Sequence, residues 1–261
     1  MSNLFKCRWF TLRHNRILWM TCLICFVFAI VIIGPHYLTD AQMVAGASNN
    51  FQGLFMASTA DCIFPLLIIS GTFTVMILGR QFSDRTVGQE IAAGHSRMEI
   101  FLSECLVGFI LPGATSLLAI LLGCIRWVGC MPLSPILTAV PYFVRTILLL
   151  LILSFSLFSP CILFLMLFRD AVKAMAASAF FLFFLCFIMA ASLASSAIVP
   201  GTAYTVAPTL PLLLNPDFLM RYVLYSTLTP AQGLWAVCVA VVWMALFLSM
   251  AYGIFRRCEL K

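Results

Sequence analysis

The stretch GRQFSDRTVGQEIAAGHSRM, Gly79–Met98, is the longest polar and charged segment that lies between two apolar runs of the chain. A short basic loop between two membrane spans faces the cytosol under the positive-inside rule. The stretch is also patterned as a short helix, which Ser83 or Asp84 can cap and Gly94 can end. Such a helix is well placed to meet a cytosolic partner, and the plain alternative is a solvated loop with a charged face.

The composition on either side of this loop excludes an ordinary soluble domain. Hydrophobic residues make up 63% of the 261 residues and charged residues only 9%. A soluble domain has about 45–50% apolar and about 25% charged residues. The net charge of +6 does not indicate nucleic acid, because the basic residues lie at the ends of apolar runs and form no separate basic domain. The chain is therefore expected to be a polytopic membrane protein.

Six apolar stretches are long enough to cross a bilayer, which takes roughly 20 helical residues. They cover about 17–38, 60–79, 99–125, 142–168, 174–198 and 231–255. The segment Met1–Arg16 before them is basic and amphipathic, which suits a helix lying in the membrane interface. Residues 199–230 are rich in proline yet apolar, which favours a re-entrant helical segment before the last span. We expect one all-α membrane domain over 1–261, with six spans and the polar loop 80–98.

The basic residues predict which side each loop faces. A cytosolic N-terminus puts twelve of them on the cytosolic side and three outside: Lys6, Arg8, Arg13, Arg16, Arg80, Arg85, Arg97, Arg169, Lys173, Arg256, Arg257 and Lys261 against Arg126, Arg145 and Arg221. The positive-inside rule then predicts that both termini lie in the cytosol. We expect an integral protein of the plasma membrane. Arg169, Asp170 and Lys173 are expected to form a tight turn between the fourth and fifth spans.

The polar loop resembles part of a known transporter family. FSDRTV from Phe82 to Val87, then GHSR from Gly94 to Arg97, then an apolar helix from near Glu99 look like the loop after the second span of type-2 ABC exporter permeases. In that family a short coupling helix at this place docks into a groove of the cytosolic ATPase. The order of the spans and a re-entrant helical pair before the last span are similar too. The family often has Gly-Thr where this chain has Arg-Thr at 85–86.

The resemblance implies a permease subunit that carries no ATPase domain of its own. Its partners would be a cytosolic ABC ATPase and a second permease, either an identical copy or a sister chain, within the lipid bilayer. ATP and Mg²⁺ would bind to the ATPase, and this chain would bind no cofactor. The residues that the resemblance assigns to ATPase coupling are Phe82, Asp84, Arg85, Thr86, Glu90, Gly94, His95, Ser96 and Arg97. The exported cargo would be a peptide, a lipid-like molecule or another amphipathic compound.

Sequence motifs for chemistry are missing from the chain. It has no Gly-x4-Gly-Lys-Ser/Thr loop to cradle ATP, and neither a His-Glu-x-x-His nor a Gly-x-Ser-x-Gly motif. No Cys-x-x-Cys pair with histidine partners appears, so a zinc site is not expected. We therefore expect no catalytic residue and no metal, and the chain is not expected to be an enzyme by itself. Cys124 and Cys130 flank an expected outer loop and could pair if that side is oxidising.

Glu104 lies one to two turns into the third expected span. It could pair with Arg80 or Arg97 across the loop, or it could line a translocation path. An ionisable group inside a membrane is costly, so it needs a partner or a function. Two alternatives to an exporter stay open: a membrane scaffold whose loop recruits another protein, and an ion-driven secondary transporter. The second is disfavoured because no expected span centre carries the ionisable relay that such transporters use.

Overall fold

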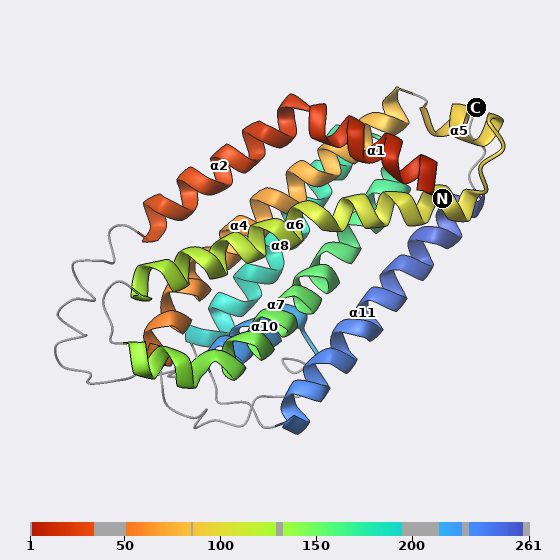
Figure 1. Ribbon diagram of the computed structural model, residues 1–261. Helices are drawn as coiled ribbons and strands as arrows, with labels where there is room; N and C mark the ends of the chain where they lie inside the picture. The colour runs from red at the N-terminus through yellow and green to blue at the C-terminus, as the bar shows by residue number, and fades with distance from the viewer. Residues whose placement is uncertain are drawn as a thin grey trace.

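The computed structural model is a bundle of long helices (Figure 1). It describes residues 2–33, 51–84, 86–128, 133–194, 214–225 and 230–257. The helices are α1 (Ser2–His14), α2 (Arg16–Ile33), α4 (Phe51–Ser83), α5 (Thr86–Ala92), α6 (Arg97–Val128), α7 (Leu133–Phe168), α8 (Ala171–Ala194), α10 (Pro216–Tyr225) and α11 (Pro230–Arg257). No strand occurs in these ranges. The short helix α5 lies at one end of the bundle, beside the start of α1 and the end of α11 (Figure 1).

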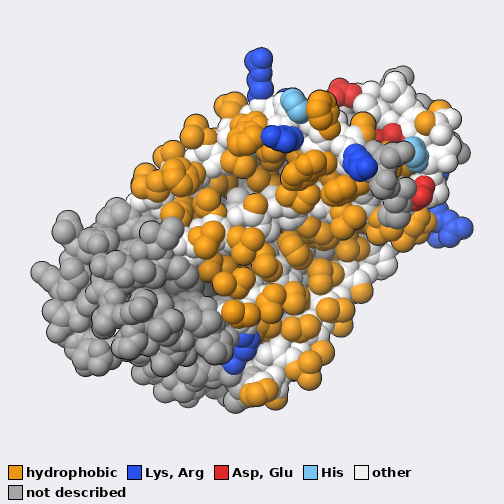
Figure 2. Space-filling model, viewed as in Figure 1, with side chains coloured by type: hydrophobic (Ala, Val, Ile, Leu, Met, Phe, Trp, Pro, Cys, Tyr) orange, Lys and Arg blue, Asp and Glu red, His pale blue; other side chains and the backbone are white. Residues whose placement is uncertain are grey.

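Five helices in the described ranges are long and apolar enough to cross a membrane, and they are α4, α6, α7, α8 and α11. The pair α1 and α2 passes the same test as one broken span, which gives up to six. The prediction of an all-α fold with five or six apolar helices long enough to cross a membrane is therefore confirmed for the described residues. Apolar side chains cover much of the visible surface, as expected of a bundle that meets lipid (Figure 2).

The break between α1 and α2 is a bend of 62° at Asn15. The side-chain oxygen of Asn15 accepts a hydrogen bond from the N–H of Ile17 at 2.9 Å, and its carbonyl oxygen accepts one from Leu18 at 3.1 Å. These are the bonds of an N-cap residue, which starts a new helix in a new direction. The indole N–H of Trp19 bridges the break by donating to the carbonyl of Arg13 at 2.8 Å. As a result α1 packs against α6 instead of continuing the axis of α2.

The helices α4 and α7 form the centre of the bundle, since 67% of each spanning window is buried, against 22% for α8 and α11. The outer face of α8 exposes a row of phenylalanines that includes Phe180, Phe183 and Phe187. Inside the bundle, α4 and α6 share a hydrogen bond from the Thr115 hydroxyl to the Ser70 hydroxyl at 3.0 Å. Polar side chains buried among spans are satisfied in this way by neighbouring helices.

Small residues bring α4 close to the start of α8. A Cβ atom placed on Gly79 would lie 2.6 Å from the Cα atom of Ala171. Only Arg169 and Asp170 separate the end of α7 from the start of α8, so the expected tight turn is present. Arg169 has a φ of 52°, in the left-handed region, and this reverses the chain direction within the turn.

The helix α10 lies in the segment where re-entrant helices were expected. Asn215 begins it, because its side-chain oxygen accepts a hydrogen bond from the N–H of Asp217 at 3.0 Å. Phe218, Met220 and Val223 are buried, and the helix packs against α7 and α4. The structure therefore contains one short buried helix here, and residues 199–213 lie outside the described ranges.

Candidate functional site

The helix α5 is the short helix that the polar loop predicts. It follows directly on the end of α4 and begins at Thr86, whose hydroxyl donates to the carbonyl oxygen of Gln81 at 2.9 Å. Val87 is only 1% exposed and anchors the helix against the bundle. The side chain of Ser83 and the whole of Arg85 lie outside the described residues, so the capping role of Ser83 stays a prediction.

Gly94 ends the helix α5, as its sequence position predicts. Its φ is +91°, a conformation that glycine adopts without steric cost. The N–H of Gly94 bonds to the carbonyl of Ile91 at 3.0 Å, and the N–H of His95 bonds to that of Glu90 at 3.2 Å. This pair of bonds is a Schellman motif, which satisfies the last carbonyl groups of a helix.

The next helix, α6, begins two residues later with a reciprocal pair of hydrogen bonds. The Ser96 hydroxyl accepts from the N–H of Glu99, and the Glu99 carboxylate accepts from the N–H of Ser96, both at 3.2 Å. This capping box satisfies two amide groups that a helix start otherwise leaves unpaired. Local hydrogen bonds therefore satisfy the backbone groups at the junction of α5 and α6 and fix the path of the chain there.

Arg8 ties α5 to the rest of the bundle. Its guanidinium Nη2 lies 2.5 Å from Oε2 of Glu90 on α5, and its Nη1 pairs with Oε1 of Glu104 on α6. The side chains of Arg8 and Glu104 are 4% and 1% exposed, and that of Glu90 is 21% exposed. One buried side chain of α1 therefore holds both helices.

The expectation that Glu104 pairs with Arg80 or Arg97 is wrong. The bend at Asn15 folds α1 across α6, and this places the guanidinium of Arg8 over the Glu104 carboxylate. An ion pair of this kind is costly to break from one side, because the remaining charge stays buried without its partner. The sequence left two roles open for Glu104, a structural ion pair or a place on a translocation path. The contact with Arg8 fits the first.

Arg97 ties the same loop to the end of α11. Its Nη1 donates to the carbonyl oxygen of Arg256 at 2.7 Å and to that of Phe255 at 3.4 Å. A cation at a helix C-terminus also meets the negative end of the helix dipole. The ring of Phe255 packs in turn against those of Phe82 and Phe101, with centroids 6.5 and 6.2 Å apart. The loop is thus held from both terminal helices of the described chain.

The outer edge of α5 is open. Gln89, Ala92 and Ala93 are exposed, whereas Val87 on the inner edge is buried. Charged and histidine side chains gather at this end of the molecule, in contrast to its apolar flank (Figure 2). The arrangement offers a small solvent-facing surface on a helix whose inner side is fixed.

The structure brings most of the expected site residues into one cluster. Thr86, Glu90, Gly94, Ser96 and Arg97 shape the loop through the bonds given above, and Phe82 packs on Phe255. His95 is half-buried and contributes its backbone N–H, whereas Asp84 is exposed and makes no side-chain hydrogen bond among those of the described residues. The residues that the sequence analysis did not identify are Arg8 and Phe255.

Within the described ranges no group of three or more His, Cys, Asp or Glu side chains could hold a metal ion. The side chains of this cluster form ion pairs, helix caps and aromatic contacts. Such contacts can fix the helices relative to one another and pass on a displacement of one of them. No known family model matches this chain, and no match is found among curated proteins.

Proposed function

We propose that this chain is the membrane-spanning permease subunit of an ATP-driven exporter of the type-2 ABC class. The observation that carries the proposal is α5, a seven-residue helix with an exposed outer edge and a fixed inner edge, placed between two helices that can cross a membrane. The excess of basic residues at this end of the bundle favours a cytosolic location for α5. A cytosolic ATPase would dock on the outer edge of α5.

The side-chain contacts that hold α5 suggest how a displacement of α5 would be transmitted to the bundle. Arg8 links α5 to α1 and α6, and Arg97 links the following turn to α11. A displacement of α5 that keeps these contacts moves the ends of α1, α6 and α11 together. ATP and Mg²⁺ would bind to the ATPase and supply the driving force. Elements that move as packed bodies about short hinges are a common form of such coupling.

Two permease subunits, identical or sister chains, would enclose the export path in this proposal. The apolar faces of the bundle favour a peptide, lipid-like or other amphipathic cargo that moves outward. Glu104 pairs with Arg8, and this proposal gives it a structural role.

The test is a pull-down of the tagged chain from native membranes in a mild detergent, with mass spectrometry of the proteins that co-purify. The variant Gln89→Trp with Ala92→Trp puts bulky rings on the outer edge of α5. It keeps the Arg8–Glu90 ion pair and the hydrogen bond from Arg97 to Arg256. Lys6→Trp is the matched control, because it adds the same ring to an exposed position on α1 at the same end of the bundle. We expect a P-loop ATPase with the wild type and with Lys6→Trp, and its loss with the α5 variant.

The absence of an ATPase from all three preparations would refute the proposal, provided that a known ABC complex stays whole in the same detergent. A different protein that is lost only with the α5 variant would instead assign the loop to a scaffold. An ATPase retained equally by all three would move the docking surface away from α5.

A further inference from the structure

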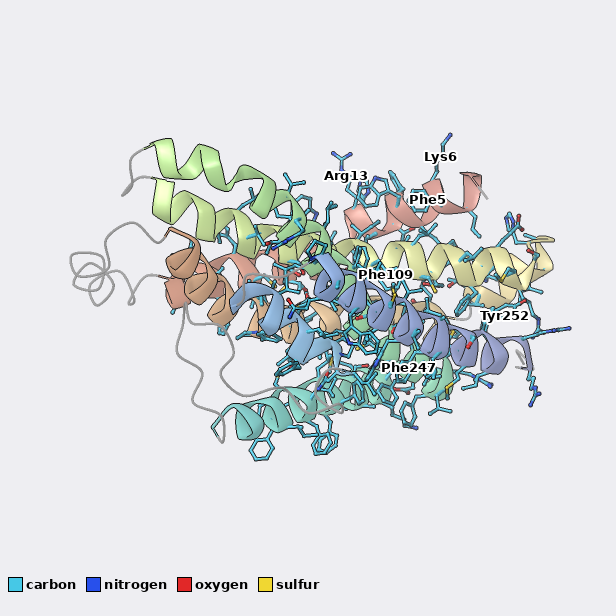
Figure 3. All side chains as sticks on the ribbon, turned by 90° about the horizontal axis from the view of Figure 1, so that it is seen from below. Phe5, Lys6, Arg13, Phe109, Phe247 and Tyr252 are labelled. Carbon is cyan, nitrogen blue, oxygen red and sulfur yellow. The ribbon has the colours of Figure 1, made fainter. Side chains whose placement is uncertain are left out.

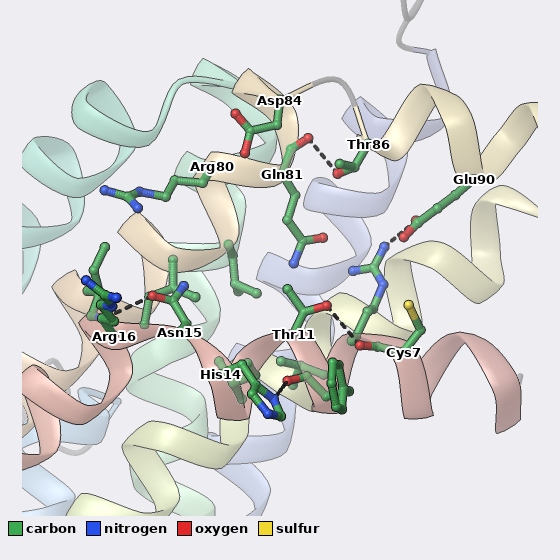
Figure 4. Close-up of a pocket in the computed structure, with 17 residues that line it drawn as sticks. Cys7, Thr11, His14, Asn15, Arg16, Arg80, Gln81, Asp84, Thr86 and Glu90 are labelled. Atoms are coloured by element: carbon green, nitrogen blue, oxygen red, sulfur yellow. Dashed lines mark hydrogen bonds and ion pairs between the residues drawn. The ribbon is translucent and has the colours of Figure 1, made fainter.

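A pocket of about 700 Å³ lies under the bend between α1 and α2 (Figure 4). Its lining comes from the second half of α1, the start of α2, the end of α4, the loop with α5, and one residue of α6. We refer to it as the elbow pocket. Its volume falls within the range of about 300–1,000 Å³ that small-molecule sites occupy.

Two arginines of the elbow pocket have no carboxylate partner. Arg16 and Arg80 both line it, and neither forms an ion pair within the described part of the chain. Their guanidinium groups lie on the same side of the pocket in Figure 4. A third arginine, Arg8, is already paired with Glu90, and the remaining carboxylate of the lining is Asp84. The lining therefore keeps an excess of positive charge at Arg16 and Arg80.

Apolar side chains form part of the wall of the elbow pocket, beside polar ones such as Thr11, Asn15 and Gln81. Ile17, Ile77 and Val107 line it on α2, α4 and α6. Beside it on α2, Trp19 exposes 61% of its surface while its indole N–H bonds to a backbone carbonyl. Tryptophan with one polar and one apolar end is typical of the boundary between bilayer and water. The pocket thus places two arginines without an ion-pair partner among the described residues next to apolar side chains, close to a tryptophan of the kind that favours the bilayer boundary.

We propose that the elbow pocket binds an anionic phospholipid, with the phosphate held by Arg16 and Arg80 and the start of an acyl chain against Ile17 and Ile77. Guanidinium groups bind phosphate oxygens through paired, charge-assisted hydrogen bonds. Basic pockets between membrane helices bind anionic headgroups for the same reason. The bound lipid would brace the bend at Asn15 and so the position of α1. This inference does not depend on the proposed export function.

The experiment is native mass spectrometry of the purified full chain, titrated with phosphatidylglycerol or with phosphatidylcholine of the same acyl chains. The variant Arg16→Gln with Arg80→Gln removes both free cations. Lys6→Gln with Arg13→Gln is the matched control, because it removes the same charge from α1 side chains that point away from the bundle and do not line the pocket (Figure 3). A basic residue contributes about 1 kcal/mol to anionic lipid binding, so two predict about thirtyfold weaker binding of phosphatidylglycerol.

The control variant is expected to keep the wild-type affinity, and binding of phosphatidylcholine is expected to be weak and unchanged in all forms. Ile17→Trp is a second variant, which keeps both arginines and fills the apolar part of the pocket. It is expected to lose phosphatidylglycerol as well, and it decides the question if the double arginine variant fails to fold. Equal losses in the test and control variants would overturn the proposal. Displacement of the lipid by inorganic phosphate at millimolar concentration would also overturn it, by assigning the site to a free anion.

Discussion

Arg8 and Glu90 stand 82 positions apart in the chain, and their side chains meet at 2.5 Å where α1 crosses the end of α5. The same guanidinium reaches Glu104 on α6. Two carboxylates therefore depend on one buried cation. The bonds on either side of this contact are local helix caps, so Arg8 supplies the long-range link that positions α5 from the N-terminal side.

Arg8→Gln is expected to destabilise the bundle strongly. It leaves the Glu104 carboxylate buried without its cation, and breaking a buried ion pair from one side costs about 3–5 kcal/mol. Denaturant unfolding of the purified chain in detergent measures the loss. Arg13→Gln is the control, since Arg13 is an exposed arginine on the same helix. Adding Glu104→Gln to Arg8→Gln should recover much of the loss, and equal stability of the Arg8 and Arg13 variants would contradict the tie.

Gly94→Ala is expected to loosen the end of α5. Its φ of +91° lies where a Cβ atom is unfavourable, and the left-handed region costs an L-residue about 1–2 kcal/mol. Gly88→Ala is the matched control, because Gly88 lies within α5 and a Cβ atom there would meet nothing within 4 Å. Hydrogen exchange of the α5 amides should become faster in the Gly94 variant and slower or unchanged in the Gly88 variant. The opposite order would show that the Schellman turn does not limit the opening of α5.

Gly79→Ala is expected to separate α4 from α8. The new Cβ atom would lie 2.6 Å from the Cα of Ala171, a backbone atom that cannot rotate away. Overpacking of this kind costs about 1–3 kcal/mol. Gly253→Ala adds the same methyl group to another helix where nothing lies within 4 Å, and both changes share the gain in helix propensity. The thermal unfolding midpoint should fall for the Gly79 variant relative to the Gly253 variant, and equal midpoints would refute the close contact.

Asp170 is expected to make stability depend on pH through its cap of α8. Its carboxylate accepts hydrogen bonds from the N–H groups of Lys173 at 3.0 Å and Val172 at 2.9 Å. The bond from Lys173 is the main cause that lowers the pKa of Asp170 below its ordinary value of 3.8. A lowered folded-state pKa means that this stabilisation is complete well above pH 3.8 and is lost as the pH falls through the folded-state value.

Asp170→Asn is the variant that tests this dependence, because asparagine can also cap a helix but does not titrate. Thermal unfolding between pH 6 and pH 3 should show a smaller drop in midpoint for the variant than for the wild type. The other carboxylates titrate alike in both proteins, so the difference between the two curves belongs to Asp170. Identical curves would show that the cap makes no contribution.

The helical class and the local shape of the loop could be predicted from the sequence. Long apolar runs predict membrane helices, and the position of Gly94 predicts the end of α5, because both depend on residues close in the chain. The partner of Glu104 could not be predicted in the same way. Its contact with Arg8 requires the 62° bend at Asn15 and the packing of α1 on α6.

One signal for Arg8 was nevertheless present in the sequence. Leu4, Arg8 and Leu12 recur every four residues and so share one face of the helix. Both leucines are 6% exposed in the structure. An arginine on the buried, apolar face of this helix needs a carboxylate partner, because an unpaired buried charge is costly. By residue type alone, Arg8 resembles its exposed neighbours Lys6 and Arg13, and all three fit the charges of a helix in the membrane interface.

The contact between Arg97 and the carbonyl of Arg256 spans 159 positions. During synthesis the ribosome therefore completes α5 long before the acceptor of Arg97 exists. Arg97 can make its two contacts with α11 only after α11 has been translated and inserted. A chain truncated before α11 would lack both carbonyl acceptors of Arg97, and the turn between α5 and α6 would lose its contact with α11.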